Sequence, residues 1–142
     1  MRVTKVCFLI SVHFLLSGLI PVRGVSDDPD DIRKLTAGIR KKCIAETEAP
    51  LEVIQDTEYG LFPEDDRLKC YFKCALEKSG LMDKRGGIKY DLLKKIIPQS
   101  YKELGNDMID SCIHVDAEDK CEKAFNFMKC MFEANPIAFI AP

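Results

Sequence analysis

Six of the seven cysteines constrain the fold of this chain more than any other feature of its sequence. They are separated by 26, 3, 37, 8 and 8 residues, and they are Cys43, Cys70, Cys74, Cys112, Cys121 and Cys130, whereas Cys7 lies in the predicted leader described below. An even number of cysteines in a small exported domain is typical of a disulfide framework, here of three bonds. Zinc ligation is the alternative, but it usually uses Cys-x2-Cys pairs, which this sequence lacks, and His114 is the only histidine beyond residue 13. We therefore expect disulfides, and no metal or other cofactor.

The first 24 residues have the pattern of a secretory signal peptide. Arg2 and Lys5 precede an apolar run over residues 6–20, and Val22 and Gly24 are small residues at the positions before a cleavage site. The run is shorter than the roughly 20 residues that span a bilayer, which disfavours a retained membrane anchor. We predict a signal peptide over residues 1–24, a single mature domain over residues 25–142, and secretion into extracellular fluid.

The charge of the predicted mature domain excludes two classes of partner. All 23 acidic residues but only 18 of the 21 basic residues lie after residue 24, so the formal net charge is −5. A moderately acidic domain without a dense basic patch is a poor ligand for nucleic acid or for an anionic membrane. We expect neither nucleic-acid binding nor stable membrane insertion.

Residues 68–77 are the segment around which we expect the other elements to assemble. Cys70 and Cys74 lie four apart among strong helix formers, so their Cβ atoms should be roughly 5–6 Å apart, farther than the about 3.5–4.5 Å of a disulfide. They should therefore bond to two different elements. Cys121 and Cys130 are nine apart on another helix and point in opposite directions. Excluding a bond within either pair leaves ten of the 15 possible pairings open.

Apolar side chains recur with helical spacing, and no segment of the mature domain alternates as a strand would. Proline, glycine and acidic residues give the expected boundaries. The predicted helices cover about residues 32–43, 50–55, 63–79, 90–97, 104–113 and 121–135. The fold class predicted is all-α, with five to six short helices cross-linked by three disulfides.

The order Cys-x26-Cys-x3-Cys-x37-Cys-x8-Cys-x8-Cys resembles the six-cysteine signature of insect odorant-binding proteins, notably in the x3 and final x8 gaps. The segments KCYFKCALEKSGLMD, DLLKKIIP and KCEKAFNFMKCMFEANP fit as well, and the resemblance covers the whole mature chain. It implies disulfides 43–74, 70–121 and 112–130. It also implies an internal apolar cavity that binds an odorant, a pheromone or a similar semiochemical. The protein would then carry this ligand through aqueous fluid.

The resemblance further implies that apolar positions on the last four helices line this cavity. The expected wall residues are Phe72, Leu76, Leu93, Ile96, Met108, Phe125, Met128 and Phe132. For each one, an ordinary core position is an equally weighted alternative. The apolar tail IAFIAP, residues 137–142, should fold back so that Phe139 and Ile140 close the cavity mouth, with a disordered tail as the alternative.

Catalysis is not expected. Six bonded cysteines leave no thiol nucleophile, and no serine lies in a G-x-S-x-G turn. The sequence CIHVD faintly resembles the His/Asp pair of secreted phospholipases, but the cysteine doublet and glycine-rich calcium loop of those enzymes are missing. His114 titrates near neutrality by default and has two interpretations, an acid-triggered release switch or, with greater weight, a solvated residue.

Two other functions stay open at this level. One is a saposin-like lipid-interacting module, although the Cys-x2-Cys start of that group is missing, and the other is a secreted helical receptor ligand. The expected partner is a small apolar ligand, with a chemosensory receptor as an open second partner and a monomer or weak homodimer as the expected state. Displacement of an apolar probe by odorants favours a carrier, whereas vesicle leakage without probe binding favours the membrane module.

Overall fold

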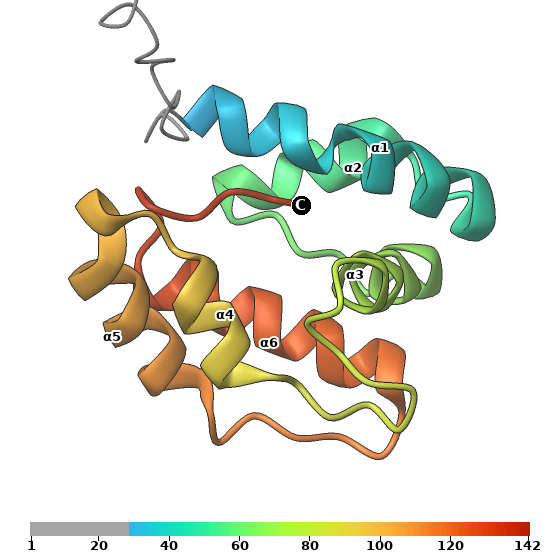
Figure 1. Ribbon diagram of the computed structural model, residues 1–142. Helices are drawn as coiled ribbons and strands as arrows, with labels where there is room; N and C mark the ends of the chain where they lie inside the picture. The colour runs from blue at the N-terminus through green and yellow to red at the C-terminus, as the bar shows by residue number, and fades with distance from the viewer. Residues whose placement is uncertain (1–28) are drawn as a thin grey trace, which may run out of the picture.

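The computed structural model describes residues 29–142, which form helices and no strand beyond one isolated bridge between Met82 and Ile88. The elements, in order, are α1 (Pro29–Thr47), α2 (Leu51–Asp56), the short 3-10 helix η1 (Thr57–Tyr59), α3 (Asp66–Lys78), α4 (Tyr90–Ile96), the 3-10 helix η2 (Gln99–Tyr101), α5 (Lys102–Cys112) and α6 (Lys120–Ala134) (Figure 1). The all-α prediction is confirmed for this part of the chain. The predicted leader lies outside the described residues.

Helix α3 begins three residues later than the sequence suggested, because Asp65 takes the capping position. Its carboxylate accepts hydrogen bonds from the backbone N–H groups of Arg67 and Leu68, at 2.8 and 3.3 Å. The Arg67 side chain binds the same carboxylate and, with these backbone donors, lowers the pKa of Asp65 to about 2. The cap satisfies N–H groups that would otherwise have no partner at the start of the helix.

Helix α3 is the centre of the molecule. It packs on α1 and on α6, and α6 in turn packs on α5, which carries α4 (Figure 1). Cys74 is bonded to Cys43 of α1, and Cys70 is bonded to Cys121 of α6. The third bond joins Cys112 at the end of α5 to Cys130 of α6. These are the three pairs that the resemblance implied, and the two cysteines of α3 bond to different elements as the helical spacing predicted.

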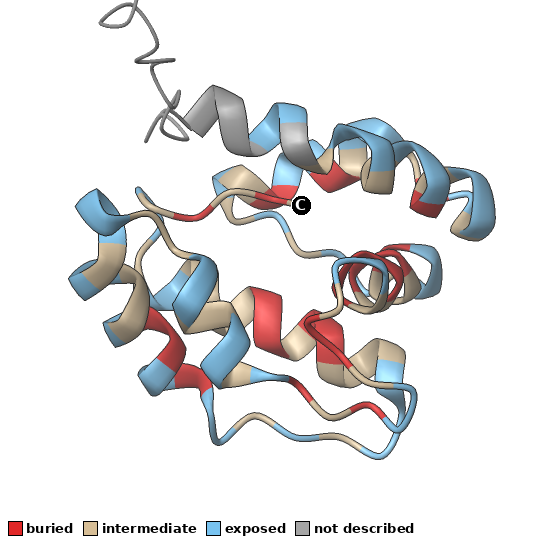
Figure 2. Cartoon of the chain, viewed as in Figure 1, coloured by how far each residue is buried: buried red, intermediate tan, exposed pale blue. Residues whose placement is uncertain are grey.

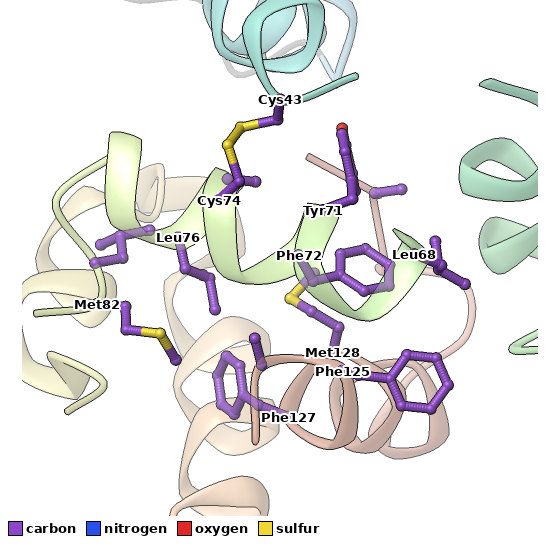
Figure 3. Close-up of a cluster of buried hydrophobic side chains, with 14 of the residues drawn as sticks. Cys43, Leu68, Tyr71, Phe72, Cys74, Leu76, Met82, Phe125, Phe127 and Met128 are labelled. Carbon is purple, nitrogen blue, oxygen red and sulfur yellow. A yellow bond between two sulfur atoms is a disulfide. The ribbon is translucent and has the colours of Figure 1, made fainter. Parts of the chain in front are cut away.

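The buried side chains lie mostly where α3 faces α6 and along the inner side of the neighbouring loops (Figure 2). Leu68, Phe72 and Leu76 of α3 meet Phe125 and Met128 of α6 in one apolar cluster (Figure 3). Lys69 strengthens this interface, since its ammonium lies 2.6 Å from the Glu122 carboxylate, 2.5 Å from that of Glu64 and 5.4 Å from the centre of the Phe125 ring.

Candidate ligand-binding site

Phe62 is the centre of an aromatic cluster at one end of the apolar core. It lies in the loop between η1 and α3 and is half-buried. Its ring centre is within 5.7–6.3 Å of four other rings, which belong to α3, α6 and the tail: Phe72, Phe125, Phe132 and Phe139. At these separations the rings are in contact, so one loop residue connects α3, α6 and the tail.

Seven of the ten side chains expected to line a cavity belong to this core or pack against it. Phe72, Leu76, Phe125, Met128 and Phe139 are buried members of the cluster, and Leu93 and Phe132 are half-buried at its edge. Met108 is buried on α5 outside that cluster, and Ile140 is half-buried in the tail. The buried members contact one another, and the accessible apolar surface is that of the half-buried members.

The expectation that Ile96 lines an interior wall is wrong. Its side chain is 58% exposed at the end of α4. The neighbouring Ile97 packs on α5 instead, so closely that a Cβ added at Gly105 would lie 2.6 Å from its Cδ1 atom. Consecutive residues at a helix end point in directions about 100° apart, so when Ile97 faces α5, Ile96 faces solvent.

The tail, residues 137–142, runs back across the molecule between α1 and η1 (Figure 1). Phe139 and Ala141 are buried, whereas Ile137 is 98% exposed. The Phe139 ring contacts Phe62 and Phe132 and so covers the aromatic cluster. For this described part of the chain, the tail therefore folds back as expected, with Phe139 as its buried anchor.

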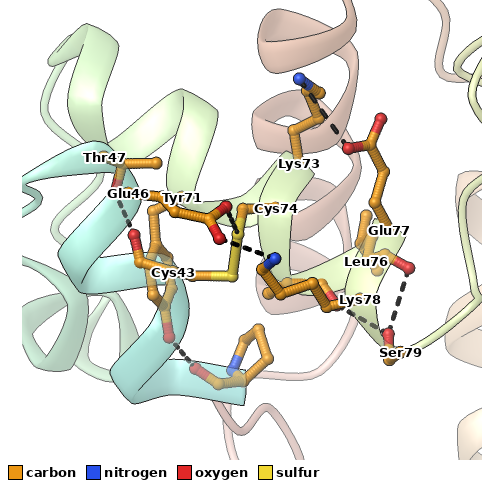
Figure 4. Close-up of a disulfide and its surroundings, with 12 residues drawn as sticks. Cys43, Glu46, Thr47, Tyr71, Lys73, Cys74, Leu76, Glu77, Lys78 and Ser79 are labelled. Carbon is orange, nitrogen blue, oxygen red and sulfur yellow. Dashed lines mark hydrogen bonds and ion pairs between the residues drawn. A yellow bond between two sulfur atoms is a disulfide. The ribbon is translucent and has the colours of Figure 1, made fainter.

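A clasp of three polar side chains holds the tail. Arg40 of α1 donates hydrogen bonds to the carbonyl oxygens of Ala141 and Pro142, at 2.7 and 3.2 Å. The Tyr71 hydroxyl of α3 donates to the Pro142 carbonyl, close to the Cys43–Cys74 disulfide (Figure 4). The third member of the clasp is Glu58 of η1.

Glu58 accepts a hydrogen bond from the Ala141 backbone N–H at 3.2 Å and pairs with Arg33 of α1 at 2.9 Å. The tail is thereby joined to α1, η1 and α3 at once. Burial raises the pKa of Tyr71 although the Arg40 guanidinium opposes this shift, so the hydroxyl keeps its proton and stays a donor at neutral pH.

The roles of Phe62 and of the clasp were not predicted from the sequence. Phe62 follows Gly60 and precedes Pro63, a pattern that predicts only a break in the chain. An aromatic residue inside such a short Gly–Pro loop was the one available signal. From the sequence, Arg40 and Glu58 are expected to be solvated charges on helix surfaces. Their role as hydrogen-bond partners depends on where the tail lies.

A separate pocket opens on the surface beside this cluster. It has a volume of about 440 Å³ and is lined by residues of α2 and of the loop before α3: Val53, Asp56, Gly60, Leu61, Phe62 and Pro63. None of the expected wall residues lines it. Phe62 is shared between the pocket and the aromatic cluster.

His114 lies just beyond α5 and is exposed.

No helix within residues 29–142 is long and apolar enough to cross a membrane.

Short helices tied by three disulfides around a partly accessible aromatic cluster, with a tail folded over it, define a small helical carrier domain for apolar ligands. The comparisons with known proteins agree. The PBP/GOBP family profile matches residues 26–134, and the chain belongs to this family of pheromone- and general-odorant-binding proteins. Proteins of this family carry small hydrophobic ligands and are not enzymes.

Individual relatives extend the match over most of the chain. General odorant-binding protein 69a of Drosophila melanogaster is 27% identical over 123 residues, which are 85% of this chain and 82% of that protein. The crystal structure of odorant binding protein 4 of Chrysopa pallens has a TM-score of 0.74 and 28% identity, over 81% of this chain and 98% of that one. Odorant binding protein 7 of Anopheles gambiae, with four disulfide bridges and in complex with an azo compound, has a TM-score of 0.69 and 32% identity, over 78% of this chain and 91% of that one.

Proposed function

We propose that the protein is secreted, takes up odorants, pheromones or similar semiochemicals between α3, α6 and the tail, and carries them through aqueous extracellular fluid. One observation supports this most directly: the aromatic cluster keeps half-buried rings, Phe62 and Phe132, under a tail that only hydrogen bonds, an ion-paired glutamate and one phenylalanine hold in place. A ligand that displaces these rings from one another gains apolar contacts on all sides.

The energetics of such uptake are favourable for a small apolar molecule. Burial of apolar surface yields roughly 25 cal/mol per Å², so a ligand that buries about 200–300 Å² gains several kcal/mol before the costs of binding. That gain corresponds to micromolar affinity as an order of magnitude. The three disulfides support this function, because each can add about 2–4 kcal/mol of stability and so offset a core that opens for a guest.

Relatives provide a starting set of ligands. The Anopheles gambiae relative is in complex with an azo compound, and the ring cluster around Phe62 offers flat apolar surfaces here. We therefore include flat aromatic molecules beside aliphatic alcohols and aldehydes among the candidate cargoes.

Binding of N-phenyl-1-naphthylamine to oxidised protein of residues 25–142, followed by displacement with octanol, decanal and aromatic odorants, tests the proposal. We expect saturable probe fluorescence and displacement. Phe132→Ala should weaken probe binding, whereas Ile96→Ala, at an exposed apolar position, should leave it unchanged. Absence of probe binding, or leakage of vesicles in its place, would contradict a carrier and favour the lipid-interacting alternative.

Secretion is a separate part of the proposal. Expression of the full chain in insect cells should deliver the protein to the medium with Val25 as its first residue. Mass spectrometry of the secreted protein checks the cleavage position, and retention of residues 1–24 would contradict it. Native mass spectrometry of the same sample would reveal the oligomeric state and any co-purified small molecule.

A further inference from the structure

The surface pocket beside Phe62 has features that the proposed interior site does not use. It is formed by residues of α2 and by residues 60–63. Its volume of about 440 Å³ is within the roughly 300–1,000 Å³ common for small-molecule sites. Four of its six lining residues are apolar: Val53, Leu61, Phe62 and Pro63.

Leu61 is an exposed apolar side chain in the lining of this pocket. It is 58% exposed, and two further exposed apolar residues, Leu51 and Tyr59, lie in the same segment of the sequence and are 43% and 80% exposed. A concave lining with such a side chain offers accessible apolar surface to a small ligand.

One residue in the lining of the pocket, Asp56, is acidic. Residues 43–66 contain eight acidic residues and no basic one, but basic residues outside this range form ion pairs with Glu46, Glu58, Glu64 and Asp65. Asp56 lines the pocket, and Glu52 lies four residues earlier on α2, so the two exposed carboxylates share one face of this helix. Within residues 29–142 no hydrogen bond or ion pair engages the Asp56 carboxylate, whereas that of Glu58 is already bound to Arg33 and Ala141.

We propose that this pocket is a second binding site, for small apolar cations such as protonated amines with an aromatic or short aliphatic body. The body lies against Val53, Leu61 and Phe62, and the ammonium group lies beside Asp56. Apolar burial supplies the affinity, and the carboxylate selects the charge of the ligand. The pocket shares the Phe62 ring with the aromatic cluster, and none of the wall residues expected for the interior site lines it.

Three molecules of one shape test the selection by charge: benzylamine, benzyl alcohol and benzoate at pH 7. Each is titrated into ¹⁵N-labelled protein, and backbone amide shifts are followed by NMR with N-phenyl-1-naphthylamine present at saturation. We expect shifts centred on residues 51–62 and tightest binding of benzylamine. Because an exposed ion pair contributes at most about 1 kcal/mol, the preference over benzyl alcohol should be about two- to fivefold.

Asp56→Asn should reduce benzylamine binding to the level of benzyl alcohol without affecting the alcohol. This substitution keeps the backbone bond from the Leu61 N–H to the Asp56 carbonyl, so the loop should keep its conformation. Asp91→Asn on α4 is the matched control, an exposed carboxylate in another helix, and should change nothing. Leu61→Ser should weaken both ligands, and every variant should bind the naphthylamine probe as the original chain does.

Equal affinity for the three molecules, shifts outside residues 51–62, or identical effects of the two aspartate variants would overturn the proposal. Displacement of the probe by benzylamine would do so as well, because the amine would then occupy the interior site. Failure of probe binding with intact amine binding would contradict only the carrier function.

Discussion

Gly60 satisfies two requirements at one backbone position. Its φ of +86° is in the left-handed region, and an added Cβ would lie 2.9 Å from the Phe132 ring. Gly80 is a matched control, since its φ is +75° and no atom lies within 4 Å of a Cβ added there. We predict that Gly80→Ala lowers the free energy of unfolding by about 1 kcal/mol and that Gly60→Ala lowers it by at least about 1 kcal/mol more. Urea unfolding measures both, and equal effects would contradict a tight loop–α6 contact.

Because of Tyr71, we expect the free energy of unfolding to depend on pH in the alkaline range. Burial raises its pKa, so above pH 10 the unfolded chain loses the phenolic proton while the folded chain keeps it. Stability is therefore fully present below about pH 10 and decreases as the pH rises through the folded pKa. Tyr71→Phe should remove part of this decrease and, at pH 8, cost about 1 kcal/mol for the lost hydrogen bond to Pro142.

Unfolding by urea at pH 8 and at about pH 10.5 checks this prediction. Burial also raises the pKa of Tyr90, so some alkaline decrease should remain in the Tyr71 variant. Tyr59→Phe, at an exposed position, should leave the profile of the original chain unchanged. An alkaline decrease of the same size in the Tyr71 variant would show that the hydroxyl has no such role.

The three disulfides differ in the sequence separation of the two cysteines that they join. The α3–α6 bond joins cysteines 51 residues apart, and the α5–α6 bond joins cysteines 18 apart. In the chain-entropy account a longer closed loop restricts the unfolded chain more, here by about 1 kcal/mol. We predict that the double variant Cys70→Ala/Cys121→Ala is less stable by this amount than Cys112→Ala/Cys130→Ala. Urea unfolding of both checks it, and the reverse order would show that native packing outweighs loop length.

The helices were predictable because their signals are local. Proline, capping acids and helical spacing within single segments were enough to predict all six helices. The four-residue spacing of Cys70 and Cys74 was enough to predict that each forms a disulfide with a different element. The aromatic cluster was not predictable in this way, since the contacts of Phe62 depend on how α3, α6 and the tail assemble. Ile96 was misplaced for a related reason: at a helix end, packing on α5 decides which of two adjacent isoleucines faces inward.

The whole molecule is organised so that one short segment covers the aromatic cluster from outside the disulfide framework. The cysteines cross-link α1, α3, α5 and α6, whereas the tail after α6 carries no cysteine and is held by Phe139 and the clasp. The tail can therefore detach while the cross-linked helices keep their arrangement. This separation predicts that ligand exchange and global stability respond differently to changes in the tail.

Truncation after Asn135 tests this separation directly. It removes the Phe139 ring from Phe62 and Phe132 together with the hydrogen bonds of Arg40, Tyr71 and Glu58 to the tail. Since each 1.4 kcal/mol corresponds to a tenfold change, we predict at least about tenfold faster dissociation of N-phenyl-1-naphthylamine, measured by stopped-flow fluorescence. Arg40→Gln in the full-length chain should give a smaller acceleration, because Phe139 remains. Unchanged dissociation in the truncated protein would show that the ligand leaves by a route that the tail does not cover.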